Sequence, residues 1–156
     1  MVLLKKYIQL LNHNTIGEYM NIKLLHSITN EEFTDILKSV GFKTYTDEQV
    51  TKALKNTMYV VKAMINNEIV GMGRVVGDYS IVCMLTDICV KPKYQKMGIG
   101  LKIVEELKRL VEDNLKKGEK IQIELVPTAG NIDFYKKAGF KYKKDVALGM
   151  YLWIKK

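Results

Sequence analysis

The segment from Val90 to Gly100 (VKPKYQKMGIG) has the composition of an anion-binding loop. Gly98 and Gly100 stand where an apolar, strand-like run passes into an amphipathic run, so the first N–H groups of the expected helix carry little side-chain cover. These free donors and the positive end of the helix dipole favour a phosphate. Residues 88–104 also contain four lysines and no acid. The segment therefore predicts a phosphate site, and a glycine-rich connection that only permits close packing is the competing interpretation.

The common phosphate-loop patterns do not fit this segment. A Walker loop places Gly-Lys-Ser/Thr after its spacer, whereas this chain has Gly100-Leu101-Lys102. A dinucleotide fingerprint needs a third glycine where Ile103 stands. The loop must therefore belong to another class of phosphate-binding protein, if it binds phosphate at all.

Length and composition narrow the class of protein. The chain has 156 residues, 47% of them hydrophobic, with a formal net charge of +8, which predicts one globular domain. It contains no apolar run long enough for a membrane span, and two cysteines suit a reduced cytoplasmic location. Arg74 and Arg109 are its only arginines. Since sequence-reading DNA binders depend on arginine, no nucleic-acid partner is expected. No membrane partner is expected either, because no apolar run is long enough to span a membrane.

Hydrophobic periodicity and turn signals predict the elements that would position the loop. We expect an N-terminal extension (1–20), with a short amphipathic helix in it, and one domain at 21–156. The predicted fold class is α/β (α+β), a mixed, largely antiparallel twisted sheet of about six to seven strands with helices on both faces. Strands are expected at 21–28, 58–65, 68–76, 81–90, 120–126, 140–144 and 148–154, and helices at 29–41, 46–54, 98–117 and 132–138. On the long helix, Glu105 and Arg109 are spaced for an ion pair.

Two motifs together resemble one family. Gln95-Lys96-Met97-Gly98-Ile99-Gly100 resembles the Q/R-x-x-G-x-G/A signature of GNAT-type N-acetyltransferases, which use acetyl-CoA. Phe134-Tyr135-Lys136-Lys137-Ala138-Gly139-Phe140, on the far side of one predicted strand, resembles their Y-x-K-x-G-F element. The likeness covers residues 21–156 in element order and implies a GNAT-like fold. The chain departs from many relatives at Thr128, where they carry asparagine, and at Asn131, where they carry alanine.

The resemblance implies a role for each residue of these motifs. Backbone groups of residues 88–90 would bind the pantetheine arm. The amides of residues 97–101 would hold the pyrophosphate, and the side chains of Gln95 and Lys96 would flank it. Tyr135 would also protonate the leaving thiolate as a general acid. The implied acetyl-CoA-binding residues are Ile88, Cys89, Val90, Gln95, Lys96, Met97, Gly98, Ile99, Gly100, Leu101, Asn131 and Tyr135.

The group that removes the amine proton is left open. Asp87 lies where relatives often have a carboxylate, and it is either the general base or a structural acid bonded to neighbouring backbone. Glu124 is a second candidate that could simply face water. By analogy with relatives, Phe42, Tyr45 and the 145–150 loop would line the acceptor end of the cleft.

The sequence and the resemblance thus predict an N-acetyltransferase that moves acetyl from acetyl-CoA directly to a primary amine of a small molecule, as a monomer or homodimer. A non-catalytic CoA- or acyl-CoA-binding module is the alternative, and a lysine-rich nucleic-acid-binding protein is a weaker one. Cys83 and Cys89, six residues apart on one strand, would share a face without bridging. The isolated histidines give no metal-ligand spacing.

Overall fold

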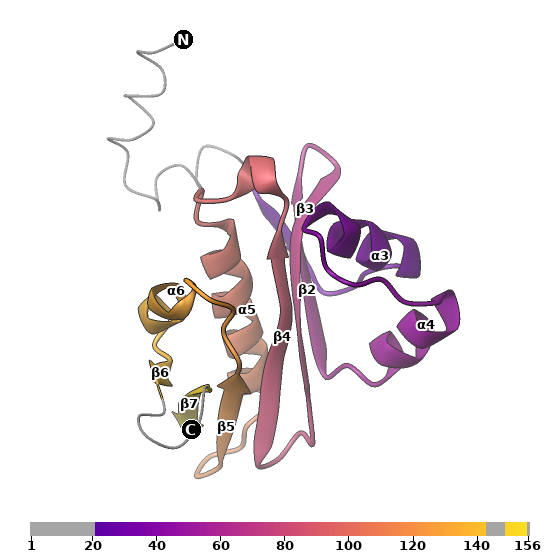
Figure 1. Ribbon diagram of the computed structural model, residues 1–156. Coiled ribbons are helices and arrows are strands. Elements are labelled where there is room, and N and C mark those ends of the chain that lie inside the picture. Colours follow the sequence, from indigo (N-terminus) through magenta and orange to yellow (C-terminus); the bar gives the residue numbers. More distant parts are fainter. Residues whose placement is uncertain (1–20, 143–148, 156) are drawn as a thin grey trace, which may run out of the picture.

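A seven-stranded sheet forms the centre of the computed structural model, which describes residues 21–142 and 149–155 (Figure 1). The strand order is β1-β2-β3-β4-β5-β7-β6. Neighbouring strands are antiparallel except β4 and β5, which run parallel. The strands are β1 (Lys23–Leu25), β2 (Tyr59–Ile65), β3 (Glu68–Gly77), β4 (Val82–Val90), β5 (Lys120–Leu125), β6 (Lys141–Tyr142) and β7 (Met150–Lys155).

Two short helices, α3 (Asn30–Ser39) and α4 (Asp47–Lys55), cover one face of the sheet (Figure 1). Each begins with a capping box, in which a threonine and the third helical residue bond each other's backbone N–H groups. The apolar sides of these helices bury Phe33, Ile36, Leu37 and Val50 against Met72 and Cys89 of the sheet. Lys62 of β2 donates to both carboxylate oxygens of Glu32, at 2.6 and 2.7 Å, which ties α3 to the sheet.

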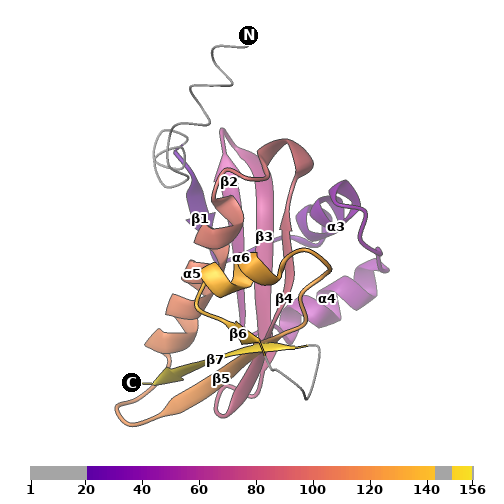
Figure 2. The same cartoon turned by 60° about the vertical axis from the view of Figure 1, so that its left-hand side comes forward.

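The long helix α5 (Ile99–Asp113) and the short helix α6 (Ile132–Lys137) lie on the other face (Figure 2). A one-turn 3-10 helix, η1 (Pro92–Tyr94), connects β4 to the loop before α5. The buried side of α5 packs on β2, β3 and β4 in the larger core cluster. That side consists of Ile99, Ile103, Val104, Leu107 and Val111.

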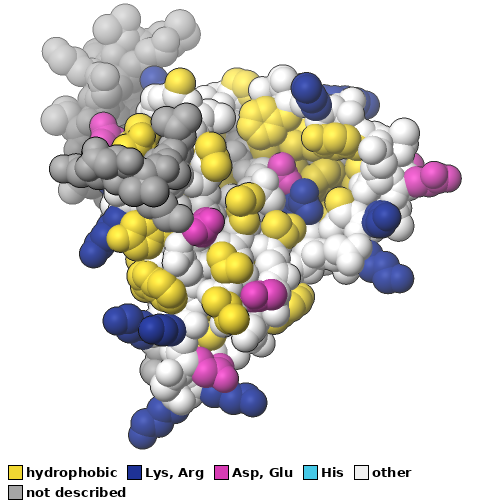
Figure 3. Space-filling model, turned by 60° about the horizontal axis from the view of Figure 1, so that its bottom comes forward, with side chains coloured by type: hydrophobic (Ala, Val, Ile, Leu, Met, Phe, Trp, Pro, Cys, Tyr) yellow, Lys and Arg dark blue, Asp and Glu magenta, His cyan; other side chains and the backbone are white. Residues whose placement is uncertain are grey.

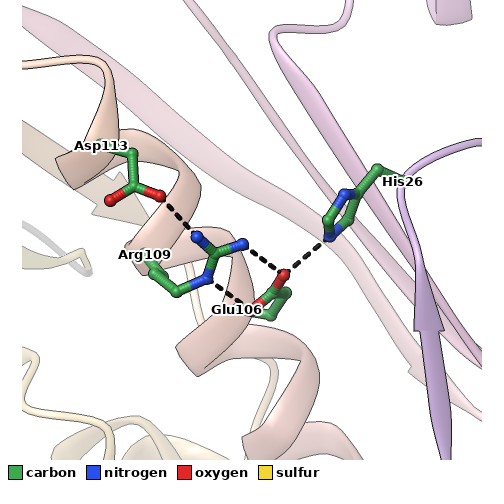
Figure 4. A network of polar contacts seen from close by, with 4 residues as sticks. All are labelled: His26, Glu106, Arg109 and Asp113. Carbon is green, nitrogen blue, oxygen red and sulfur yellow. Dashed lines mark hydrogen bonds and ion pairs between the residues drawn. The ribbon is translucent and has the colours of Figure 1, made fainter.

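A charged network fastens α5 to the chain just after β1 (Figure 4). The Arg109 guanidinium donates to Glu106 and to Asp113, and the His26 ring lies 2.7 Å from Glu106 Oε1. Arg109 and His26 hold the pKa of Glu106 at about 2, against some desolvation. The expected pair of Glu105 with Arg109 does not form, because Arg109 binds Glu106, three residues before it, and Asp113, four residues after it, while Glu105 pairs with Lys108.

The predicted fold class, strand number and placement of helices on both faces are confirmed. The first strand and the long helix were predicted to be longer than they are. Only three residues of the first predicted strand pair with β2, because β1 is the outer strand of the sheet. Helix α5 ends at Asp113, and Leu115 is buried in a following turn rather than in the helix. The N-terminal extension and its expected helix, together with residues 143–148, lie outside the described part of the chain.

Candidate active site

A cleft opens where β4 and β5 separate. Their parallel pairing covers Val82–Met84 with Gln122–Glu124, and no further rungs join the two strands. The cleft has a volume of about 390 Å³. Its described lining comes from the α3–α4 connection, β4, the loop before α5, and the segment from β5 to α6: Val40, Phe42, Met84, Leu85, Thr86, Asp87, Ile88, Cys89, Val90, Gln95, Val126, Thr128, Asn131 and Tyr135.

A β-bulge in β4 shapes this opening. Gly73 of β3 faces two residues of β4, Asp87 and Ile88, and Asp87 adopts the left-handed backbone conformation with φ +53°. The bulge bends β4 and turns Ile88 towards α5. A Cβ atom on Gly73 would lie 2.3 Å from Ile88 Cδ1, so only glycine leaves room for this side chain as it is placed.

The bulge also reverses which residues of β4 face each side of the sheet. Cys83 packs in the core beneath α5, whereas Cys89 packs beneath α3. The prediction that these two cysteines share a face is therefore wrong, because one extra residue between them shifts the alternation by one. Burial raises the pKa of both thiols to about 12, and the nearby Asp78 and Asp87 carboxylates add to the effect. Neither thiol is ionised at neutral pH, which disfavours Cys89 as a nucleophile.

The backbone of Val90 is free to face the cleft. Lys91 N–H donates to Val70 across the β3–β4 pair at 2.8 Å, and Val90 stands opposite Gly71 in the adjacent position. In an antiparallel pair these positions alternate, so the N–H and C=O of Val90 point away from β3. The Gln95 side-chain amide reaches back and donates to the Val90 carbonyl at 3.0 Å. The Val90 N–H remains as a donor for an extended ligand laid along β4.

The loop before α5 presents backbone donors rather than side-chain caps. Lys96 and Gly98 both have positive φ, at +62° and +80°. Gly98 occupies the N-cap position, and no side chain of the described residues caps this helix end, unlike the threonine-capped α3 and α4. Successive backbone N–H groups with such left-handed residues among them form a concavity for anions. Met97 to Leu101 thus offer donors and the positive end of a fifteen-residue helix.

Part of the lysine field around this loop is neutralised by Glu68, at the start of β3. Its carboxylate accepts from Lys91 at 2.9 Å, Lys93 at 3.1 Å and the Tyr94 hydroxyl at 2.9 Å. These three hydrogen bonds lower the pKa of Glu68 to about 2. Sequence reasoning missed Glu68, because it stands more than twenty residues before the loop. Its contacts tie η1 to the sheet.

Tyr135 lies at the cleft wall near the end of α6. Its ring packs edge-to-face between Phe134 and Phe140, with centroid distances of 4.8 and 6.0 Å. Burial, with a smaller contribution from Cys89, raises the pKa of the phenol to about 12. The hydroxyl is therefore protonated throughout the neutral range and can donate a proton or a hydrogen bond. The departures from the family pattern meet here too, since the Asn131 amide donates to the Thr128 hydroxyl at 2.7 Å.

Asp87 faces the cleft but already has a partner. Its carboxylate accepts a hydrogen bond from Arg74 Nε, and Arg74 also donates to the Thr57 hydroxyl at 3.1 Å and lies over the Phe33 ring. Glu124 is half-buried, rather than facing water as the alternative interpretation supposed, and accepts from Gln122 at 2.7 Å. Arg74 is a second residue whose contact with the site was not foreseen.

The structure brings most of the predicted site residues to one place. Asp87, Gln95, Asn131 and Tyr135 line the same cleft, as do Ile88, Cys89 and Val90 of the strand. The remaining loop residues, Lys96 to Leu101, stand beside it at the start of α5. Of the expected acceptor-end residues, Phe42 lines the cleft, Tyr45 does not, and 145–148 lie outside the described chain.

Two negative findings apply to the described residues only. No group of three or more His, Cys, Asp or Glu side chains is arranged there to hold a metal ion. None of the helices described is long and apolar enough to cross a membrane.

Comparison with known proteins gives consistent results. The model of the acetyltransferase (GNAT) family matches residues 22–140. An uncharacterized N-acetyltransferase, ycf52, from Pyropia yezoensis is 27% identical over 124 residues, which cover 77% of this chain and 69% of that protein. A chloroplastic GCN5-related N-acetyltransferase 2 from Arabidopsis thaliana is 30% identical over 89 residues, covering 56% of this chain and 33% of the relative.

Solved structures share the fold. A probable acetyltransferase from Meticillin-resistant Staphylococcus aureus superposes with a TM-score of 0.72 and 26% identity, covering 84% of this chain and 98% of the other. The GNAT-family protein SP0256 from Streptococcus pneumoniae gives a TM-score of 0.61, also with 26% identity, over 78% of this chain and 86% of its own.

Proposed function

Since the chain belongs to the acetyltransferase (GNAT) family and is an acyltransferase, we propose that it transfers acetyl from acetyl-CoA directly to the primary amine of a small molecule. One observation carries the proposal. The cleft between β4 and β5 is lined by Val90 and Gln95, which come just before the uncapped start of α5, and by Tyr135, so a proton donor lines a cleft next to a candidate anion site.

The donor site fits a long ligand with phosphates near one end. The Val90 N–H is available along β4, while Gln95 already satisfies the Val90 carbonyl. Backbone donors from Met97 to Leu101 would hold the pyrophosphate at the positive end of α5, with Lys96 beside them. When bound, acetyl-CoA would supply a thioester carbonyl open to attack by an amine.

Tyr135 serves the leaving sulfur in this proposal. A phenol of pKa about 12 holds its proton more tightly than an ordinary thiol, whose pKa is about 8.5. Tyr135 therefore donates a hydrogen bond to the sulfur as negative charge develops there. If the phenol proton passes to the sulfur, the phenol must regain a proton before the step is complete. In the overall step a C–N bond forms and the C–S bond breaks, the amine loses one proton, and the sulfur gains one.

Asp87 is the proposed acceptor of the amine proton, directly or through water. The competing role is structural, since Asp87 binds Arg74 at the bulge. Asp87→Asn separates the two roles. A base predicts loss of the ionisation that limits the rate at low pH, whereas a purely structural acid predicts lower stability with the shape of the pH–rate profile retained. Full activity at every pH would remove Asp87 from the reaction.

Calorimetric titration with acetyl-CoA, followed by thiol release across an amine panel, tests the proposed function. Micromolar binding and amine-dependent release are expected. Binding without amine-dependent release would instead support a CoA-binding module, and no binding would exclude both. A steep salt-dependent affinity for DNA or RNA would favour the nucleic-acid alternative. Cytoplasmic location and a monomeric or homodimeric state stay predictions, and one relative is named chloroplastic.

A further inference from the structure

Part of the cleft lining is apolar. Val40 and Phe42 come from the α3–α4 connection, Met84 from β4 and Val126 from the end of β5. Three of these side chains stay open to solvent, with exposed fractions of 41% for Phe42, 42% for Met84 and 70% for Val126. Hydrophobic groups exposed inside a cleft mark a surface that a ligand can cover favourably.

Charge is distributed differently from what the +8 total suggests. Among the described residues that line the cleft, none is Lys or Arg, and Asp87 is the only one that carries charge. In Figure 3, hydrophobic side chains gather on the face turned to the viewer, and most Lys and Arg side chains stand at its outline. The one guanidinium close to the cleft floor, Arg74, is bound to Asp87. The described lining therefore provides no cationic partner for an anionic substituent.

We infer that the acceptor is a primary amine with an aromatic or extended aliphatic substituent. This inference rests on the proposed function and specifies its substrate. The apolar substituent lies against Phe42, Met84 and Val126, and the nitrogen points towards Asp87. The flexible Met84 side chain adapts to substituents of different shape. The bond changes are those of acetyl transfer from acetyl-CoA to the nitrogen.

The test compares two amines at saturating acetyl-CoA by thiol release: 2-phenylethylamine and ethanolamine. Phenylethylamine is expected to exceed ethanolamine in kcat/KM by at least about tenfold, because each additional apolar carbon that is buried stabilises the bound amine.

A matched pair of variants locates the effect. Met84→Gln and Val82→Thr each replace an apolar side chain by a polar one of similar size on the same strand. Both residues are about equally exposed, at 42% and 40%, but only Met84 lines the cleft. Met84→Gln is expected to reduce the preference for phenylethylamine over ethanolamine by about threefold or more, and Val82→Thr to leave it unchanged.

The outcomes separate this inference from the proposed function. Release without a preference for phenylethylamine over ethanolamine overturns the inference and leaves the acetyltransferase proposal standing. An equal effect of the Met84 and Val82 variants also overturns it, because the preference would then not arise in the cleft. Acetyl-CoA binding with no release for any amine overturns the proposed function and the inference together.

Discussion

Replacing Gly73 with alanine tests how the bulge, α5 and the cleft depend on one another. The added Cβ would lie 2.3 Å from Ile88 Cδ1, 2.9 Å from Ile103 Cγ2 and 3.0 Å from Leu107 Cδ1. Side chains must therefore move, and overpacking of this kind costs about 1–3 kcal/mol. Loss of backbone freedom in the unfolded chain offsets about 0.4–1 kcal/mol of that. We expect a net loss of about 1–2 kcal/mol in the free energy of unfolding.

Urea denaturation measures this loss, and thermal unfolding should show a decrease of about 2–4 °C per kcal/mol. Gly100→Ala is the control, because a Cβ there meets its nearest atom, in the Phe134 ring, at 3.4 Å, an ordinary contact. Alanine also suits a helix better than glycine, by about 0.5–1 kcal/mol. The control is therefore expected to be as stable as the natural chain or slightly more so.

A second substitution identifies Ile88 as the group displaced. Ile88→Val removes the Cδ1 atom closest to the new methyl group and alone costs about 0.5–1.5 kcal/mol. In the double variant the two costs should sum to less than additivity predicts, by at least about 0.5 kcal/mol. Because Ile88 also lines the cleft, Gly73→Ala should weaken acetyl-CoA binding as well. Additive stabilities in the double variant, or a Gly73→Ala protein as stable as the control, would refute the reasoning.

Three further predictions concern the site and its support. Tyr135→Phe is expected to lower turnover at least about tenfold with acetyl-CoA affinity unchanged, and unchanged turnover would rule out its role as an acid. Because the pKa of the phenol is about 12, Tyr135 should cause no alkaline loss of rate below about pH 11. For Glu32, burial raises the pKa, but hydrogen bonds from Lys62 and from the cap of α3 outweigh burial and lower it overall, so its contribution to stability should be present above the unfolded pKa and disappear as pH falls. Glu32→Gln removes the negative charge opposite Lys62 but keeps one acceptor oxygen, so it should cost about 1–2 kcal/mol in urea at pH 7. It should also flatten that acid dependence, whereas an unaltered acid limb would contradict the assignment. Gly98→Ala should destabilise the chain by about 1–2 kcal/mol because φ is +80° and should weaken acetyl-CoA binding in calorimetry, whereas Gly100→Ala should bind normally; equal behaviour of the two variants would show that the left-handed position does not matter.

Local sequence was sufficient for the elements and for the loop. The threonine caps, the apolar stripe of α5 and the alternation of β5 each depend on neighbours within a few residues, so their signals are readable in a short window. The loop from Gln95 to Gly100 was readable from its local composition as well, whereas the Tyr135 segment was identified by its resemblance to a family motif. Boundaries were less accurate, since the end of a strand such as β1 depends on how far its partner extends.

The sequence by itself determined the mixed sheet with helices on both faces, the glycine-bearing start of α5, and the family of the chain. Only the tertiary structure decided the bulge at Asp87, which placed Cys83 and Cys89 on opposite faces. It also decided the pairing of Asp87 with Arg74, the contacts of Glu68 with the loop, and the apolar side chains that line the cleft. The physical reason is range: helix caps and alternation arise between near neighbours, whereas a bulge register, an ion pair between strands and the lining of a cleft arise only when distant segments pack together.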